Sequence, residues 1–188
     1  MPAREPVSLH ASGAAGVGLQ VRFDWREDRH VHTISLEVDD RLIPLLESVE
    51  GSSVDTWPPS PPLQQLSVEQ LRPATQVALL VGMAGKSHWS MSVEPAGDRC
   101  AFVFDVACRS RGPVEWLGSA YLLLAEGLAT HGEYDATIDA EGRSIRLRCD
   151  REGATAASVK DDPSGLRIEP AVINPGGTTR WRYAIQLD

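Results

Sequence analysis

Apolar and polar side chains alternate one by one over much of this chain, and that period constrains the fold more than any other feature of the sequence. In the segment 17–25, VGLQVRFDW, every odd position carries an apolar residue, and the even positions carry glycine or a polar residue. Successive side chains of a β-strand point to opposite faces of a sheet, which gives such a segment one apolar face. The period therefore predicts strands packed on a core, because an amphipathic helix would repeat about every 3.6 residues.

The sequence REDR separates two alternating segments and predicts the turn of a β-hairpin. If these four residues form the loop, Trp25 lies opposite His30 and Phe23 lies opposite His32 on the two strands. Other alternating segments predict further strands near 63–71, 75–81, 87–93, 100–108, 134–140, 143–149, 166–170 and 178–188. Residues 75–81 are apolar on both faces, which is typical of a central strand.

About ten short strands at spacings near 8–12 residues predict an all-β fold in one domain over 1–188, an antiparallel β-sandwich or distorted β-barrel with at most one or two short helices. The segments 39–50 and 114–126 fit either a strand or a helix, and Pro44 suits neither a helix interior nor a central strand. Three regions are expected outside the strands, namely a loosely ordered 1–15, a Pro-rich surface loop over 52–62 and a polar loop over 150–164.

The charge of the chain excludes some classes of partner. With 26 acidic and 18 basic residues the net charge is −8, and no basic stripe appears, so neither nucleic acid nor an anionic membrane is an expected partner. No run of about 18 apolar residues predicts a membrane span. Three cysteines leave one thiol without a possible disulfide partner, which favours a reducing compartment and predicts a cytoplasmic protein.

The triplet Gly85-Lys86-Ser87 is similar to the end of a phosphate-binding loop, but its context differs. In that motif a glycine stands five positions before the second glycine, and here Leu80 occupies the place. The residues after the triplet alternate and do not predict a helix whose N-terminus could face a phosphate. We therefore expect a hairpin turn in which Gly82 and Gly85 adopt positive φ.

His30 and His32 lie two residues apart and so share one face of a strand, which is the geometry of many metal-binding histidine pairs. With His88 the pattern resembles, in part, the two metal-binding motifs of the cupin family. The first motif, His-x-His followed by Glu, matches His30, His32 and Glu37, and the second matches Gly85 and His88.

Met83 and Ser92 stand where the second cupin motif has proline and asparagine, and Glu37 faces away from the two histidines on a regular strand. The resemblance implies a metal-binding protein or metalloenzyme in which His30, His32 and His88 bind a divalent transition metal. Imidazole ligands of this kind suit Zn, Fe or Mn.

Exposed tryptophans suggest another function, since indole rings can stack on the apolar C–H faces of sugars. Trp57 stands in the Pro-rich loop and Trp25 at a hairpin end, so these two are the candidates for a carbohydrate-binding module. Trp89, Trp116 and Trp181 alternate with apolar neighbours and are interpreted as core residues.

The sequence contains no nucleophile constellation and no cofactor loop, so a non-catalytic protein without a cofactor is expected. The first hypothesis is a binding or assembly module for a small ligand or a protein partner, including self-association. Its ligand-binding residues would be Trp25, His30, His32 and Trp57, near the Pro-rich loop and the hairpin end. The cupin-like metalloprotein and the carbohydrate-binding module are the alternatives.

Overall fold

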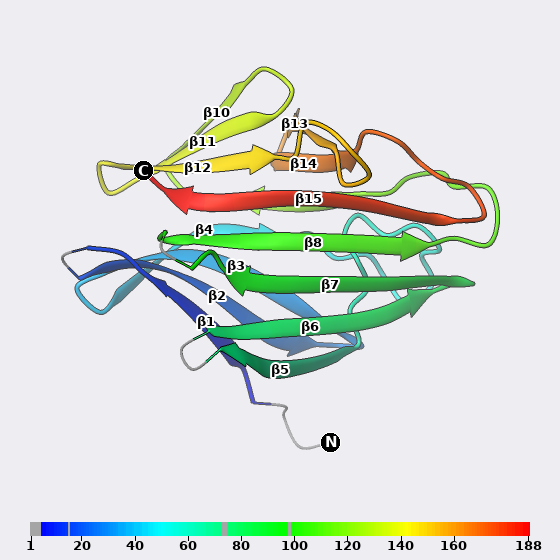
Figure 1. Ribbon diagram of the computed structural model, residues 1–188, viewed down its shortest axis with the longest axis horizontal. Coiled ribbons are helices and arrows are strands. Elements are labelled where there is room, and N and C mark those ends of the chain that lie inside the picture. Colours follow the sequence, from blue (N-terminus) through cyan, green and yellow to red (C-terminus); the bar gives the residue numbers. More distant parts are fainter. Residues whose placement is uncertain (1–4, 15, 73–74, 98) are drawn as a thin grey trace.

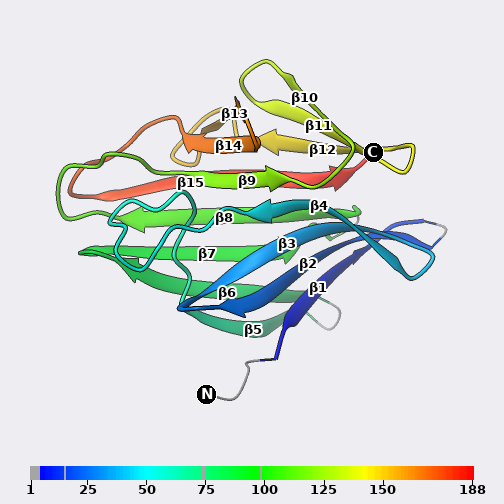
Figure 2. The same ribbon diagram turned by 180° about the vertical axis from the view of Figure 1, so that it is seen from behind.

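The fold is all-β, with two antiparallel sheets packed face to face (Figures 1 and 2). The computed structural model describes residues 5–14, 16–72, 75–97 and 99–188, and these residues form fifteen strands and no helix. The sheets make an open sandwich, not a closed barrel, with more strands than the ten or so expected from the sequence. The strands beyond those predicted from alternation are Val7–Ser12, Arg41–Ser48, Ser119–Leu123, Gly127–His131 and Ala157–Asp162.

The first sheet has seven strands and is seen in front in Figure 2. Its strands follow the order β1 (Val7–Ser12), β2 (Val17–Arg26), β3 (Arg29–Val38), β4 (Arg41–Ser48), β9 (Ser119–Leu123), β14 (Gly165–Pro170) and β13 (Ala157–Asp162). Strands β1 to β4 are consecutive in the chain and form a meander, whereas β9 arrives from the other sheet to join β4 with β14.

The second sheet has eight strands. Their order is β10 (Gly127–His131), β11 (Asp135–Ala140), β12 (Arg143–Cys149), β15 (Thr178–Leu187), β8 (Ala101–Arg109), β7 (Ser87–Pro95), β6 (Thr75–Ala84) and β5 (Gln65–Arg72). The last strand, β15, is inserted between β8 and β12, so two meanders distant in sequence become one sheet (Figure 1).

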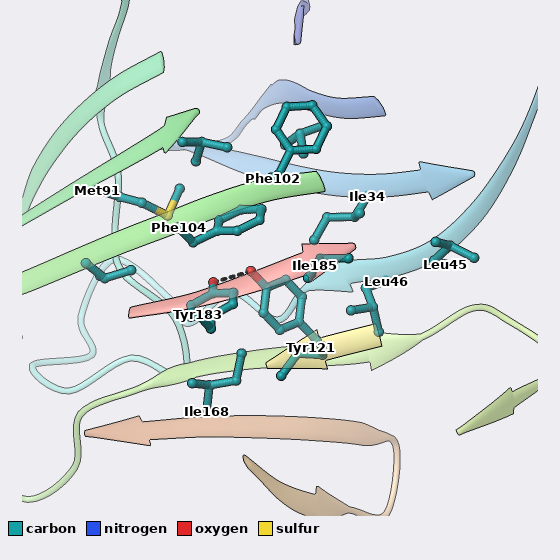
Figure 3. Close-up of a cluster of buried hydrophobic side chains, with 14 of the residues drawn as sticks. Ile34, Leu45, Leu46, Met91, Phe102, Phe104, Tyr121, Ile168, Tyr183 and Ile185 are labelled. Atoms are coloured by element: carbon teal, nitrogen blue, oxygen red, sulfur yellow. Dashed lines mark hydrogen bonds between the residues drawn. The ribbon is translucent and has the colours of Figure 1, made fainter. Parts of the chain in front are cut away.

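The apolar faces of the two sheets form one continuous core, part of which is shown in Figure 3. Its large side chains alternate along the strands as the sequence predicts, and they include Leu19, Phe23, Ile34, Leu36, Met91, Phe102, Phe104, Trp181 and Ile185. The ring of Phe104 stacks on that of Tyr183 with centroids 4.9 Å apart. This core holds the strand ends in fixed positions, and the candidate site is built at such an end.

The register of the β2–β3 hairpin is confirmed, since Phe23 lies opposite His32 and Trp25 opposite His30. The loop is shorter than the four residues expected, because Arg26 pairs with Arg29 and only residues 27 and 28 form the turn. The β11–β12 hairpin is also confirmed, with Gly142 in its tight turn at a φ of 68°.

The ambiguous segment 39–50 is a strand over most of its length, and Pro44 is accommodated by a β-bulge. Ile34 pairs with Leu46 and Ser35 pairs with Pro44, so Leu45 is the extra residue. Leu45 and Leu46 are consecutive residues and both are fully buried. In a regular strand their side chains would point to opposite faces of the sheet, so only one of them would face the core. The second ambiguous segment, 114–126, contains the short strand β9 and no helix.

Some expectations about loops and strand positions are wrong in part. Region 1–15 contains β1 and region 150–164 contains β13, both short strands with polar outer residues; residues 1–4 and 15 lie outside the described part of the chain. The Pro-rich segment 52–62 is a loop, as predicted, and is exposed over 52–56, but it is buried over much of 58–63. Proline has no backbone N–H, so such a segment can be buried with fewer unmatched donors. Strand β6 is not apolar on two buried faces, because Leu79 and Val81 are exposed to solvent.

The triplet beginning at Gly85 lies in the β6–β7 hairpin, and β7 rather than a helix begins at Ser87. Gly85 has the expected positive φ of 55°. Gly82 lies within β6 without a positive φ, so its expected turn role is wrong. A Cβ atom on Gly82 would collide with the carbonyl oxygen of Pro62, because the buried Pro-rich segment crosses the strand there.

In the described part of the chain no helix is long and apolar enough to cross a membrane. The three cysteines are free thiols, and Cys108 and Cys149 are buried. Desolvation by burial raises the pKa of each of these two thiols to about 12.

Candidate functional site

His32 lies in the core between the sheets and not at a ligand-accessible rim. Its Nε2 shares a hydrogen bond of 2.8 Å with the hydroxyl of Tyr121. Burial lowers the pKa of His32 to about 4, because the charged imidazolium would lose its water. The side chain is therefore a neutral part of the core at pH 7.

His30 and Trp25 face each other near the end of the sandwich, with ring centroids 5.0 Å apart in a T-shaped arrangement. The backbone N–H of His30 donates to the carbonyl of Leu63, 2.7 Å away, which ties the end of the Pro-rich segment to β3. His30 is buried and Trp25 is half-buried.

His88 is exposed on the outer face of the eight-stranded sheet, opposite Met83 on β6 and Arg109 on β8. It is thus on the other sheet from His30 and His32, and the structure does not bring the three rings together. Among the described residues no group of three or more His, Cys, Asp or Glu side chains is arranged to hold a metal ion.

A cleft of about 430 Å³ lies beside the turn of the β2–β3 hairpin. The turn lines one side, and the end of β4 with residues 49–51 lines another; Leu122 of β9 and Ser164 complete the lining. We call it the Arg29 cleft after its least exposed charged residue. Its volume falls in the range of about 300–1,000 Å³ that is usual for ligand sites.

Arg29 is only 4% exposed although it carries a charge. Its Nε and Nη2 donate to the two carboxylate oxygens of Asp28 at 2.7 and 3.1 Å, which fixes the guanidinium in place. Its buried Nη1 has no hydrogen-bond partner among the described residues. A residue of the cleft lining therefore carries a buried donor whose hydrogen bond is unmade.

Glu50 lines the same cleft and carries an unmatched acceptor. The hydroxyl of Ser48 donates to Oε1 of Glu50 at 2.7 Å, and the same hydroxyl accepts the backbone N–H of His32 at 3.0 Å. The other oxygen, Oε2, is buried without a partner in the described structure. Desolvation raises the pKa of Glu50 to about 7, although Ser48 and Arg29 both act to lower it.

The rest of the Arg29 cleft is half polar and half apolar. Arg26 and Glu47 form a double hydrogen bond, with distances of 2.8 and 2.9 Å. Val31 and Leu122 add apolar surface to the lining. Two guanidiniums and four carboxyl groups line the cleft in total, so its charge is not positive.

A second hollow of about 330 Å³ adjoins the first, since Val49 and Ser164 line both. We call it the Trp cleft, because Trp57 and Trp116 line it together with the polar side chains of Asp162 and Arg167. Trp57 is one of the candidate ligand-binding residues predicted from the sequence. Trp116 was interpreted as core, but it is half-buried and its Nε1 donates to Glu169 at 3.4 Å.

Sequence reasoning missed Arg29 and Glu50, which are 21 positions apart. Arg29 belongs to the charged turn sequence REDR, and such residues are usually solvated. Glu50 is the last residue of the segment 39–50, for which the sequence fits either a strand or a helix. No local pattern in the sequence distinguishes these two residues from ordinary surface charges.

Comparison with known proteins adds no further assignment to these clefts. No known protein family, no curated protein and no solved structure was found to match this chain.

Proposed function

We propose that this chain is a binding module that holds a small polar ligand in the Arg29 cleft. The observation that carries the proposal is that two residues lining one cleft, Arg29 and Glu50, each carry a buried atom without a partner, Nη1 and Oε2. A buried polar group without a partner costs about 1–3 kcal/mol, and more when it is charged. A ligand that reaches both atoms after a small movement of these side chains removes that cost, which favours binding.

Hydrogen bonds inside the protein order both polar side chains of the site. Asp28 fixes the guanidinium of Arg29, and Ser48 fixes the carboxyl of Glu50 to the backbone of β3. Both polar groups are thus held before the ligand arrives, so little side-chain entropy is lost on binding. The proposed site lies beside the β2–β3 hairpin turn, with Arg29 and Glu50 as contact residues in place of His30 and His32.

A thermal-shift screen tests the proposal. The protein is heated with a chemically diverse library of neutral, anionic and cationic metabolites, and the same screen is run on Arg29→Met and on Arg22→Met. A ligand at 100 times its Kd stabilises the folded state by about 2.7 kcal/mol. We expect at least one compound to raise the Tm of the wild type and of Arg22→Met but not of Arg29→Met.

Arg22 is the matched control because it forms an exposed ion pair with Asp24 on β2, away from the cleft lining. If no compound raises the Tm, or if every active compound acts equally on Arg29→Met, the proposed function is wrong.

The outer face of the eight-stranded sheet supports self-association as a second candidate function. Leu79, Val81 and Met83 form a row on β6 and are 42–47% exposed, beside the edge strand β5. Exposed apolar rows next to an open sheet edge are common at interfaces. Light scattering after size exclusion should give a mass above 20.4 kDa for the wild type and one chain for Val81→Lys; a monomeric wild type would contradict it.

A further inference from the structure

We infer that the ligand is a neutral carbohydrate of at least two rings, with hydroxyl groups held by Arg29 and Glu50 and ring faces packed on Trp57 and Trp116. This inference rests on the proposed binding function of the Arg29 cleft and adds the chemical class of the ligand. It is carried by three features of the two clefts: the kinds of unmatched atom, the balance of charge and the adjoining tryptophans.

The unmatched atoms select a hydroxyl group. Nη1 of Arg29 can only donate, and Oε2 of Glu50 accepts when the carboxyl is ionised. One hydroxyl donates one hydrogen bond and accepts others, so a hydroxyl or a neighbouring pair of them matches both atoms. A ligand carboxylate would match Arg29 alone, and a ligand ammonium would match Glu50 alone.

The charge of the Arg29 cleft argues against an anionic ligand. Arg26 is neutralised by Glu47 and Arg29 by Asp28, each through two hydrogen bonds. An anion would therefore meet no uncompensated cation, and Glu50 would repel it when ionised. A neutral polyhydroxylated molecule avoids this repulsion, and its hydroxyl groups can match both unmatched atoms, whereas an ammonium group would match Glu50 alone.

The Trp cleft supplies the apolar surface that a sugar ring requires. Trp57 and Trp116 are half-buried and line one hollow, where their indoles can pack on the apolar C–H face of a pyranose. Asp162 and Arg167 line the same hollow and can hydrogen-bond the ring hydroxyls. Because this hollow adjoins the Arg29 cleft, a ligand of two or more linked rings can occupy both.

The experiment titrates neutral gluco-, galacto-, manno- and xylo-oligosaccharides into the protein and follows tryptophan fluorescence and heat. Oligosaccharides that contain glucuronate or glucosamine serve as charged counterparts. We expect a neutral oligosaccharide to bind saturably and more tightly than its charged counterparts. The affinity should fall about tenfold or more in Arg29→Met and in Trp116→Ala, because each removes one of the two kinds of contact.

Trp25→Phe is the matched aromatic control, since Trp25 packs on His30 and lines neither cleft. The affinity of Trp25→Phe for the oligosaccharide should equal that of the wild type. Circular dichroism checks the fold of each variant, and Glu50→Gln replaces Arg29→Met if the latter does not fold. Glu50→Gln keeps the shape of the side chain and is expected to weaken binding in the same direction.

The inference is overturned if no neutral oligosaccharide binds at concentrations up to about 10 mM, a Kd beyond the weak end of specific binding. It is also overturned if a charged counterpart binds more tightly or if the cleft variants bind as well as the wild type. A non-carbohydrate compound whose thermal shift is lost in Arg29→Met would overturn the carbohydrate inference alone. If neither the thermal-shift screen nor the oligosaccharide titration yields a compound whose binding is lost in Arg29→Met, both the carbohydrate inference and the proposed function are wrong.

Discussion

His32 on β3 and Tyr121 on β9 share a hydrogen bond of 2.8 Å in the middle of the core. The hydroxyl of Tyr121 also lies 2.6 Å from that of Tyr183 on β15, so the chain of polar groups joins the two sheets (Figure 3). All three side chains are buried, and such groups are stable in a core only when they are paired. The stability of the fold should therefore depend on these bonds and on pH.

Acid should destabilise the protein through His32. The pKa of this residue is about 4 in the folded state and 6.5 as the reference value, so the unfolded state takes up a proton first as pH falls. The His32 contribution is complete above pH 6.5 and is lost toward pH 4, by up to ~3 kcal/mol. Urea unfolding between pH 4 and 8 should show no such loss of stability for His32→Gln. For His88→Gln, at an exposed site, the loss should be the same as in the wild type.

Glu50 should act in the opposite direction over nearly the same range. Its pKa is about 7 when folded against a reference of 4.5, so its contribution is complete below pH 4.5 and is lost as pH rises through 7. In the wild type the two contributions oppose each other between pH 4.5 and 6.5. Glu50→Gln should therefore lose stability toward acid more steeply than the wild type; identical pH profiles would contradict the assignment.

Tyr121→Phe should lower the free energy of unfolding by about 1–3 kcal/mol, because it leaves polar atoms of two neighbours, His32 and Tyr183, without this partner. Tyr183→Phe should cost less, since Tyr121 then keeps its bond to His32. Tyr134→Phe, at a half-buried position outside this chain of hydrogen bonds, is the control. Equal stabilities of the Tyr121 and Tyr134 variants by urea unfolding would show that the polar chain contributes nothing.

The alternating strands were predictable because one physical rule governs them locally. Phe23 and His32 could be placed opposite each other from the turn sequence and the two-residue period alone. Leu45 could not be placed, because its burial depends on a bulge that pairs Pro44 with Ser35. The short strands β1 and β13 were missed because pairing with a neighbouring strand, rather than a strong apolar pattern, defines them.

Gly82→Ala should destabilise the protein by about 3 kcal/mol, as overpacking against backbone does. The added methyl group would meet the carbonyl of Pro62, where the buried Pro-rich segment passes β6. Gly112→Ala is the matched control, because a Cβ there has nothing within 4 Å in the described structure. Thermal unfolding should show a clear loss of Tm for the first variant only, and comparable Tm values would argue against the close approach.

The candidate site was less predictable than the fold, because its residues come together only through the tertiary structure. Trp57 was recognised as a candidate from its place among the prolines, while Trp116 was hidden by apolar neighbours. Arg29 becomes unusual only when its low exposure is known, and Glu50 only when its buried oxygen is seen to lack a partner. Sequence alternation reports which face a residue occupies but not which strand ends meet.

Methyl NMR of the protein during titration with the strongest compound from either screen tests the central claim most directly. The Arg29 cleft is lined by Val31, Val49 and Leu122, so we predict that the largest chemical-shift changes fall on these three methyl-bearing residues. Val81 and Met83, which line a separate hollow on the other sheet, should not shift. Changes centred on Val81 and Met83, with Val31 and Leu122 unchanged, would contradict the account.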